Sequence, residues 1–395
     1  MATLCSSAAL AATVIQVPAD QGTIQSAIEV ALDGDIVLVA PGTYLENIDF
    51  LGKAIAVQSV GGPLATTIDG SAFTLGPAFR SVVLFNGGEG NDSVLEGFTI
   101  TGGQGTAPGA FPNGGGIYCA FSAPTLRNNI ITGNSASSAG GGIYVIAGFG
   151  TQIINCVIAA NSAAAGGGIY LQDASNTRIV HSTIVANSAS FIAGALDNLG
   201  SPGTQLVNSI LWANGAAPIY DTTALSITYS DVEGGWPGTG NTDAEPNFVS
   251  GPTGDYHLAS NSPCIGAASA AIAGAPATDF EGDPRSACGA PDQGADERVV
   301  CSSAVFVRGD CNSDGNINIA DPIFLLAFLF GVGVSPPTCA DASDGNDDGL
   351  LNIADAIAIL LALFAAPGPL PPPSICGDDP TTLDALECAA FAACP

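Results

Sequence analysis

The chain of 395 residues carries 36 Asp and Glu against 7 Lys and Arg, which gives a net charge of −29 at pH 7. A chain this acidic repels nucleic-acid phosphates and anionic membrane surfaces, so its charge argues against both as partners and favours divalent cations. Only 11% of the residues are charged and 51 are glycine, which indicates short strands and many turns. The apolar run 323–330 is too short for a membrane span, which needs about 20 residues.

The N-terminal residues and the cysteine content both indicate that the protein is exported. Residues 6–12 (SSAALAA) resemble the end of a signal peptide, so residues 1–12 are predicted to be a signal-peptide remnant. The chain has 11 cysteines, of which six follow residue 300. That density predicts disulfides and a secreted or cell-surface protein. The pairing does not follow from the sequence, and the odd total leaves at least one thiol unpaired, for which Cys5 is the natural candidate.

Residues 23–32 (TIQSAIEVAL) have the apolar spacing of an amphipathic helix, at Ile24, Ala27, Ile28 and Ala31. Thr23 is suited to the N-cap position, because its hydroxyl can accept from a free backbone N–H. We expect this helix to cover the open end of the repeat array that follows, where unpaired strand edges would invite aggregation.

Three series of residues recur with a period near 26. GGGIY ends at Tyr118, Tyr144 and Tyr170, a spacing of 26 residues. The other two series have spacings of 27, 26 and 27 and run through Asn134, Asn161, Asn187 and Asn214, and through Asn128, Asn155, His181 and Asn208.

This period suits one coil of a parallel β-helix, in which equivalent residues stack at about 4.8 Å. Stacked asparagines would hydrogen-bond along the array, and the Gly-Gly-Gly runs would supply positive-φ corners. The alternative is a β-sandwich with glycine-rich turns, which has no reason to keep three series in register. The predicted fold class is therefore all-β, a parallel β-helix over residues 13–298.

Residues 17–48 (VPADQGTIQSAIEVALDGDIVLVAPGTYLENI) resemble the opening of pectin-lyase-like right-handed β-helix proteins, and the similarity extends over residues 14–228. Residues 254–297 look like the tail that follows such repeats in many secreted bacterial proteins. The resemblance implies that they form the last coils and a C-terminal cap, with a bridge between Cys264 and Cys288 open as a possibility.

Two acidic segments of equal length, DCNSDGNINIAD at 310–321 and DGNDDGLLNIAD at 344–355, share one pattern. A loop of this length can place oxygen ligands around calcium from positions 1, 3, 5, 7, 9 and 12, with glycine at position 6. The sequence therefore predicts about two Ca²⁺ ions. The predicted ligands are Asp310, Asn312, Asp314, Asn316, Asn318 and Asp321 in the first loop, and Asp344, Asn346, Asp348, Leu350, Asn352 and Asp355 in the second.

Both loops end in Asp where an EF-hand has Glu, and we expect an apolar helix after each loop and none before. This arrangement resembles a type I dockerin, here a small α-helical domain at 299–366, and implies a cohesin-like partner. Positions 10 and 11 are Ile-Ala in both loops (319–320 and 353–354) and not the usual hydroxyl pair, which argues against a standard cohesin. The alternative explanation of the two segments is a pair of Asx-rich surface turns that bind no metal. The sequence also leaves open a disulfide between Cys311 and Cys339. Residues 367–395 are predicted to be a proline-rich linker and a cysteine-rich tail.

Folds like the pectin-lyase family carry polysaccharide lyases, which use calcium and a base, and hydrolases, which use two carboxylates. The candidates here are Asp173, Asp197 and Asp221, which recur at one constant interval, and Arg178. They are equally explained as turn residues, and no complete catalytic signature is present. Three functions remain: a β-helix that binds a glycan or protein with an anchoring calcium module, a secreted polysaccharide lyase or hydrolase, and a cell-surface structural protein or adhesin.

Overall fold

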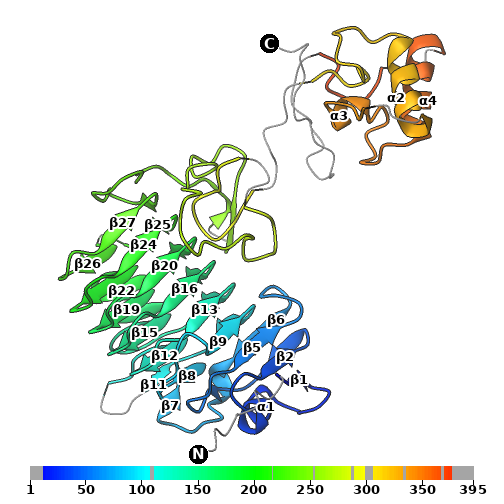
Figure 1. Cartoon of the computed structure of the whole chain (residues 1–395). Coiled ribbons are helices and arrows are strands. Elements are labelled where there is room, and N and C mark those ends of the chain that lie inside the picture. Colours follow the sequence, from blue (N-terminus) through cyan, green and yellow to red (C-terminus); the bar gives the residue numbers. More distant parts are fainter. Residues whose placement is uncertain are drawn as a thin grey trace, which may run out of the picture. The chain divides into compact units, whose positions relative to one another are not determined.

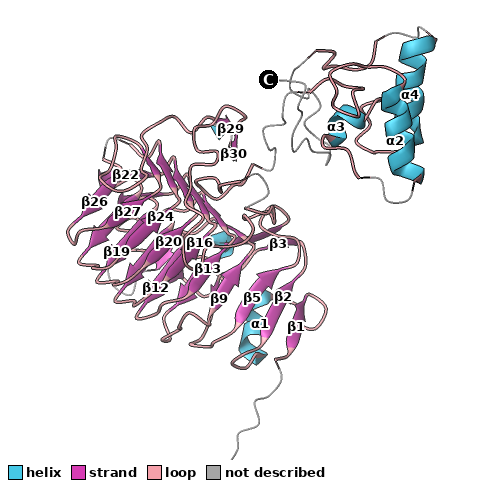
Figure 2. Ribbon diagram, turned by 45° about the horizontal axis from the view of Figure 1, so that its top comes forward, coloured by secondary structure: helices cyan, strands magenta, loops and turns pink. Residues whose placement is uncertain are grey.

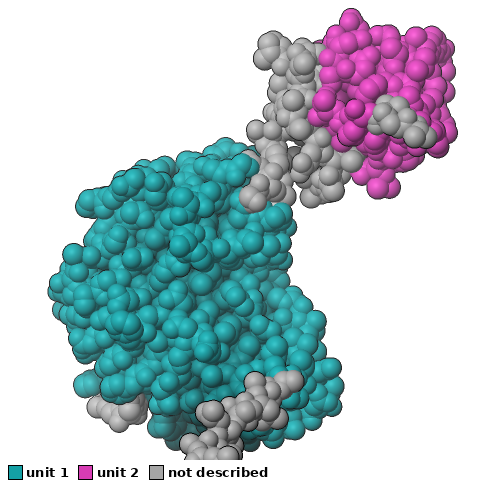
Figure 3. Space-filling view, in the orientation of Figure 1, with its two compact units in different colours: residues 1–299 teal, residues 300–395 magenta. Residues whose placement is uncertain are grey.

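The computed structural model describes residues 12–106, 111–215, 217–251, 254–285, 289–298, 306–331, 335–365 and 369–375. The chain divides into two compact units, residues 1–299 and residues 300–395 (Figures 1 and 3). The predicted signal-peptide remnant up to residue 11, Cys5, Cys288 and the cysteine-rich tail lie outside the described residues. No helix in the described ranges is long and apolar enough to cross a bilayer.

The first unit is a stack of coils whose strands form three parallel sheets (Figure 1). Sheet A consists of β1 (Val14–Val17), β2 (Ile36–Val39), β5 (Ala56–Ser59), β9 (Val94–Glu96), β13 (Thr125–Arg127), β16 (Gln152–Ile154), β20 (Arg178–Val180), β24 (Gln205–Val207) and β27 (Ser226–Thr228). Sheet B consists of β3 (Gly42–Tyr44), β6 (Thr66–Asp69), β10 (Thr99–Thr101), β14 (Ile130–Thr132), β17 (Val157–Ala159), β21 (Thr183–Val185), β25 (Ile210–Trp212) and β28 (Asp231–Val232). Sheet C consists of β4 (Ile48–Asp49), β8 (Val83–Phe85), β12 (Ile117–Ala120), β15 (Ile143–Ile146), β19 (Ile169–Gln172), β23 (Leu196–Leu199) and β26 (Ile219–Asp221).

Shorter elements lie at the corners and beyond the last coil. They are the antiparallel pair β7 (Phe79–Arg80) and β11 (Gly105–Thr106), the parallel pair β18 (Ser162–Ala165) and β22 (Ser188–Ile192), the antiparallel pair β29 (Phe248–Ser250) and β30 (Asp255–Leu258), and the short helix η1 (Gly70–Ala72).

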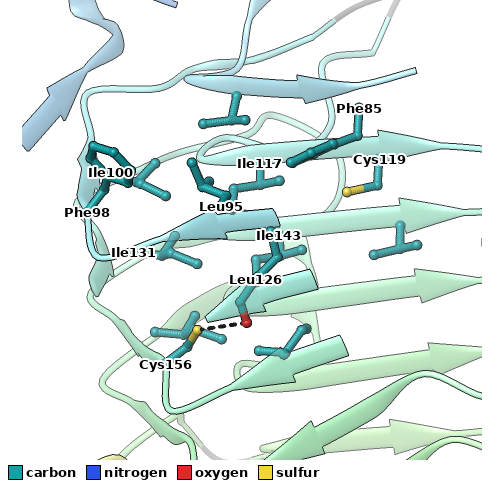
Figure 4. Close-up of a cluster of buried hydrophobic side chains, with 14 of the residues drawn as sticks. Phe85, Leu95, Phe98, Ile100, Ile117, Cys119, Leu126, Ile131, Ile143 and Cys156 are labelled. Carbon is teal, nitrogen blue, oxygen red and sulfur yellow. Dashed lines mark hydrogen bonds between the residues drawn. The ribbon is translucent and has the colours of Figure 1, made fainter. Parts of the chain in front are cut away.

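The strand register confirms the predicted coil. Tyr118 pairs with Tyr144, and Tyr144 pairs with Tyr170, so residues one period apart stack in sheet C. Inward-facing aliphatics align in the same way and fill the interior, as Ile117 and Ile143 do in sheet C (Figure 4). Because every coil places its apolar side chains over those of the previous coil, the array buries one continuous core. The sandwich alternative is wrong.

The Asn134 series forms the predicted ladder. Each side-chain Nδ2 donates to the Oδ1 of the next asparagine at 3.0–3.1 Å, from Asn134 through Asn161 and Asn187 to Asn214. All four residues are buried. The Asn128 series occupies a left-handed turn, where φ is +56° at Asn128 and +46° at His181. Asparagine tolerates that conformation better than most residues, which accounts for its recurrence there.

The Gly-Gly-Gly runs have two roles, of which the sequence predicted one. Only the first glycine of each run has positive φ, as Gly114 (+64°), Gly140 (+66°) and Gly166 (+58°) show. The second and third positions require glycine because the neighbouring coil leaves no space for a side chain. A Cβ on Gly141 would lie 2.4 Å from the carbonyl oxygen of Gly167 in the next coil. Each run therefore supplies the predicted positive-φ corner, at its first glycine.

Helix α1 (Ile24–Val30) lies at the β1 end of the stack and has the predicted N-cap (Figure 1). The Thr23 hydroxyl accepts from the Ser26 N–H, and Ile24, Ala27 and Ile28 are buried. Glu46 accepts from the first backbone amides of α1, and Lys53 Nζ donates to three carbonyls at its end. Both charges match the polarity of the helix ends.

The described part of residues 254–297 contains no further coil strand, contrary to the expectation from family resemblance. The last coil strand is β28, and β29 and β30 form a hairpin beyond it (Figure 2). The segment then packs along the outer face of sheet B, where Phe280 and Ala295 cover Val157 and Val185. Cys264 is a buried free thiol, so the bridge to Cys288 that the sequence left open is not formed.

The second unit contains α2 (Ala320–Phe330), α3 (Ala340–Ser343) and α4 (Ile353–Phe364). The predicted helix after each loop is confirmed, and Leu325 of α2 packs with Ile359 of α4. Helix α3 precedes the second loop, where we expected no helix. Cys311 is a buried free thiol and Cys339 is disulfide-bonded, so the bridge between the two that the sequence left open is not formed.

Candidate metal centre

The first acidic loop is closed by the carboxylates at its two ends. Asp310 accepts from the N–H groups of Asp314 (3.1 Å) and Gly315 (2.8 Å). Asp321, in the first turn of α2, accepts from the N–H groups of Asn312 (3.3 Å) and Asn318 (2.8 Å). Asp310 and Asp321 are both buried. The loop therefore wraps around two carboxylates that point to its inside.

The second loop repeats these contacts. Asp344 accepts from the N–H groups of Asp348 (3.3 Å) and Gly349 (2.8 Å), and Asp355 accepts from those of Asn346 (3.4 Å) and Asn352 (2.8 Å). Oxygen atoms of Asp344, Asp348 and Asp355 lie within 4.8 Å of one another. Position 4 has positive φ in both loops, as does the glycine at position 6: Ser313 and Asp347, and Gly315 and Gly349. Two segments with one sequence pattern thus fold identically.

The remaining predicted ligands also face one another. Asn312 Nδ2 donates to Asp314 at 3.1 Å, and Asn346 Nδ2 donates to Asp348 at 2.8 Å. The asparagine at position 9 donates to the carbonyl at position 7 in both loops, from Asn318 to Asn316 and from Asn352 to Leu350. Hydrogen bonds therefore connect the predicted residues within each loop, and in the second loop three carboxylates also lie within 4.8 Å of one another.

This donor set fits calcium, which prefers six to eight oxygen ligands. Burial raises the pKa of Asp321, and burial together with the neighbouring Asp344 raises the pKa of Asp355 to about 6. A raised carboxyl pKa means that the protein alone stabilises the negative charge poorly. A cation between the carboxylates would remove that penalty.

Arg308, which the sequence analysis did not single out, connects the second loop to the proline-rich run. Its side chain is buried, and Nη1 donates to the carbonyl of Asp344 at 2.8 Å. Nη2 pairs with Asp347 at 2.9 Å, while Nε donates to the carbonyl of Pro372 at 2.9 Å. The described part of the predicted linker, residues 369–375, is therefore packed onto the module, with Leu370 in its apolar core. The signal available in the sequence was a lone arginine two residues before the first loop.

The structure does not bring the four coil candidates into one site. The register partners of Asp197 in sheet C are Tyr170 and Tyr220, so the interval between the three aspartates does not correspond to one coil here. Asp173 lies in the turn after β19 and has φ of +50°. Asp173 and Asp197 both raise the pKa of Tyr170, after the larger effect of its burial, so these two lie on one side of the coils.

Asp221 and Arg178 have structural contacts. Asp221 accepts from the N–H of Leu225 and from the side chain of Asn198, which marks it as a turn residue. Arg178 is on β20 of sheet A, not sheet C, and donates to the carbonyl of Ala273. Neither belongs to a group with Asp197. His181 is buried and neutral, because burial lowers its pKa to about 2.

Asp197 is the one coil candidate with unusual surroundings. It is 3% exposed, and no hydrogen-bond donor among the described residues reaches its Oδ1. Burial raises its pKa to about 6. The side chain occupies the place that Tyr118, Tyr144 and Tyr170 hold in earlier coils, where successive rings stack at 5.6 and 5.5 Å.

A groove on the outer side of sheet B was not predicted. It has a volume of about 650 Å³ and lies between the coils and the segment after them. Its lining includes Ile130, Val157 and Ala159 from the coils and Tyr256, His257 and Phe280 from the segment. Nothing in the repeat pattern signals this groove, since it forms only when the later segment folds back.

Comparison with known proteins agrees with the coil architecture. The family model described as "Right handed beta helix region" matches residues 51–231. A crystal structure of pectate lyase Pel9A aligns with 73% of this chain and 98% of that chain, at 14% sequence identity and a TM-score of 0.42. No curated protein matches this chain. The family match and the strand pairing together show that the first unit contains a right-handed parallel β-helix.

Proposed function

We propose that this is a secreted or cell-surface calcium-binding protein, in which a dockerin-like module anchors a β-helix that contacts a glycan or a protein. One observation carries the proposal: the loops 310–321 and 344–355 share both a sequence pattern and a hydrogen-bond pattern. Surface turns that arose independently have no reason to agree at every predicted ligand position. The cysteine content and the acidic charge support an extracellular location.

Exposed apolar residues on the module support an anchoring role. Ile323 and Phe330 of α2 are 57% and 69% exposed, and Ile357 and Phe364 occupy the equivalent positions of α4 at 48% and 72%. Side chains of this kind are typical of a protein–protein contact. Since the loops carry Ile-Ala in place of the hydroxyl pair, we propose a partner with an apolar contact surface.

Exposed aromatic residues on the coils support a binding role for the β-helix. Phe121 and Phe149 are each 73% exposed and Phe191 is 85% exposed. Aromatic side chains supply large contact areas to glycans and proteins alike. The separation of Arg178, on sheet A, from the three aspartates gives no support to a polysaccharide lyase that uses these residues.

Calorimetric titration of the chelated full-length protein with CaCl₂ tests the calcium sites. We expect about two sites in the natural protein and one fewer in each of Asp314→Ala and Asp348→Ala, because a position 5 ligand is lost. Asp92→Ala is the matched control, since this exposed aspartate lies outside both loops. Absence of calcium binding, or variants that keep both sites, would refute the proposal.

A further inference from the structure

His257 of β30 lies beside the groove on sheet B and between two carboxylates. Its Nδ1 bonds to Asp255, and its Nε2 lies 2.7 Å from Glu281 Oε2. A carboxylate on Nδ1 fixes the orientation of the ring and directs Nε2 towards the opposite side. This is the arrangement that supports a metal-binding histidine.

Asp296 approaches the same point from a third segment. It is 6% exposed, and its Oδ2 accepts from the Leu258 N–H at 2.7 Å. One ligand atom each of His257, Glu281 and Asp296 lies within 4.8 Å of the others. A buried carboxylate is costly unless it is paired, and a cation placed between these three ligand atoms would pair it.

The neighbourhood has an excess of negative charge. Asp279 and Asp283 lie beside Glu281, with carboxylate oxygens of the three within 4.8 Å of one another. The buried Arg285 forms its ion pair with Glu297 and also donates to the carbonyl of Ala295, and it makes no ion pair with these three carboxylates. Among the ion pairs of the described residues, Glu281 has only the His257 imidazole as a partner, and Asp279 and Asp283 have none.

We propose that His257, Glu281 and Asp296 bind a divalent transition metal of the zinc class. A mixed set of one imidazole and two carboxylates favours such an ion, whereas calcium prefers oxygen ligands alone. Three protein ligands leave a coordination position for water or another ligand. The site is independent of the calcium loops, and the bound ion would join the β30 hairpin to the segment that covers sheet B.

The test is titration of the chelated full-length protein with ZnCl₂, with CaCl₂ present to occupy the loops. We expect one zinc site in the natural protein and none in His257→Gln or Glu281→Gln. Asp255→Asn should keep the site but weaken it by about 10- to 100-fold, because this residue only orients the imidazole. Titration with CoCl₂ gives a second readout, since bound cobalt absorbs visible light according to its coordination.

Asp283→Asn is the matched control, because it removes a neighbouring charge but no proposed ligand. Thermal melting of each variant without metal checks that it is folded. The same residues without a metal would form only an ion-paired imidazolium, consistent with the hydrogen bond to Glu281 that raises the pKa of His257 to about 10. Failure of the natural protein to bind zinc, or equal binding by His257→Gln and Glu281→Gln, would overturn the proposal. Asp314→Ala should leave zinc binding unchanged, which separates this site from the calcium loops.

Discussion

Substitution of Asn161 by alanine tests whether the asparagine ladder stabilises the coil stack. The Asn161 side chain makes four hydrogen bonds: its Oδ1 accepts from the backbone and side chain of Asn134 (3.0 and 3.1 Å), and its Nδ2 donates to Ile131 (2.8 Å) and Asn187 (3.0 Å). Each buried bond contributes about 1 kcal/mol, and partners left without a bond add a desolvation penalty. We expect Asn161→Ala to lower the free energy of unfolding by about 3–5 kcal/mol.

Guanidinium unfolding followed by tryptophan fluorescence measures this change, because Trp212 and Trp236, the two tryptophans of the chain, both belong to the β-helix unit. Asn91→Ala is the control, since this exposed asparagine has one side-chain bond, to the carbonyl of Gly150. It should lose less than about 1 kcal/mol. If the two variants differ by less than about 1 kcal/mol, water replaces the lost bonds and the ladder reasoning is wrong.

Three further variants test other parts of the structure. Gly141→Ala should abolish cooperative thermal melting or lower the melting temperature strongly, because its Cβ would lie 2.4 Å from a neighbouring carbonyl oxygen, whereas Gly90→Ala, in open space, should have little effect. Asp197→Asn should raise the free energy of unfolding at pH 8 by about 1–2 kcal/mol after solvent screening, and should change it little at pH 4. The reason is that the folded-state pKa of about 6 exceeds the usual 3.8, so the natural protein loses stability as the pH rises through 6. A stability difference between the two proteins that does not vary with pH would contradict this. Arg308→Met should weaken calcium binding and increase proteolysis after residue 369, because the buried guanidinium joins the second loop to Pro372; unchanged calorimetry and proteolysis would count against this role.

The sequence alone determined the coil and the loop geometry. A parallel stack places residues one period apart in contact, so the recurrence of Asn134 and Asn161 is enough to predict that these side chains are neighbours. The acidic loops are equally local, because Asp310 and Asp321 meet through a turn of a few residues with glycine at position 6. Contacts between residues at short or periodic spacing can therefore be predicted from the sequence pattern.

Only the tertiary structure decided what the irregular segments do. Asn155 bonds to the carbonyl of Thr278, which is 123 residues away, and no period links these two positions. The same applies to Arg308 with Pro372, and to the meeting of His257 with Asp296. These contacts depend on how buried polar groups of one segment find partners on another, which is a property of the packed chain and not of local spacing. For that reason the sequence missed the groove and suggested an aspartate cluster that the coils do not form.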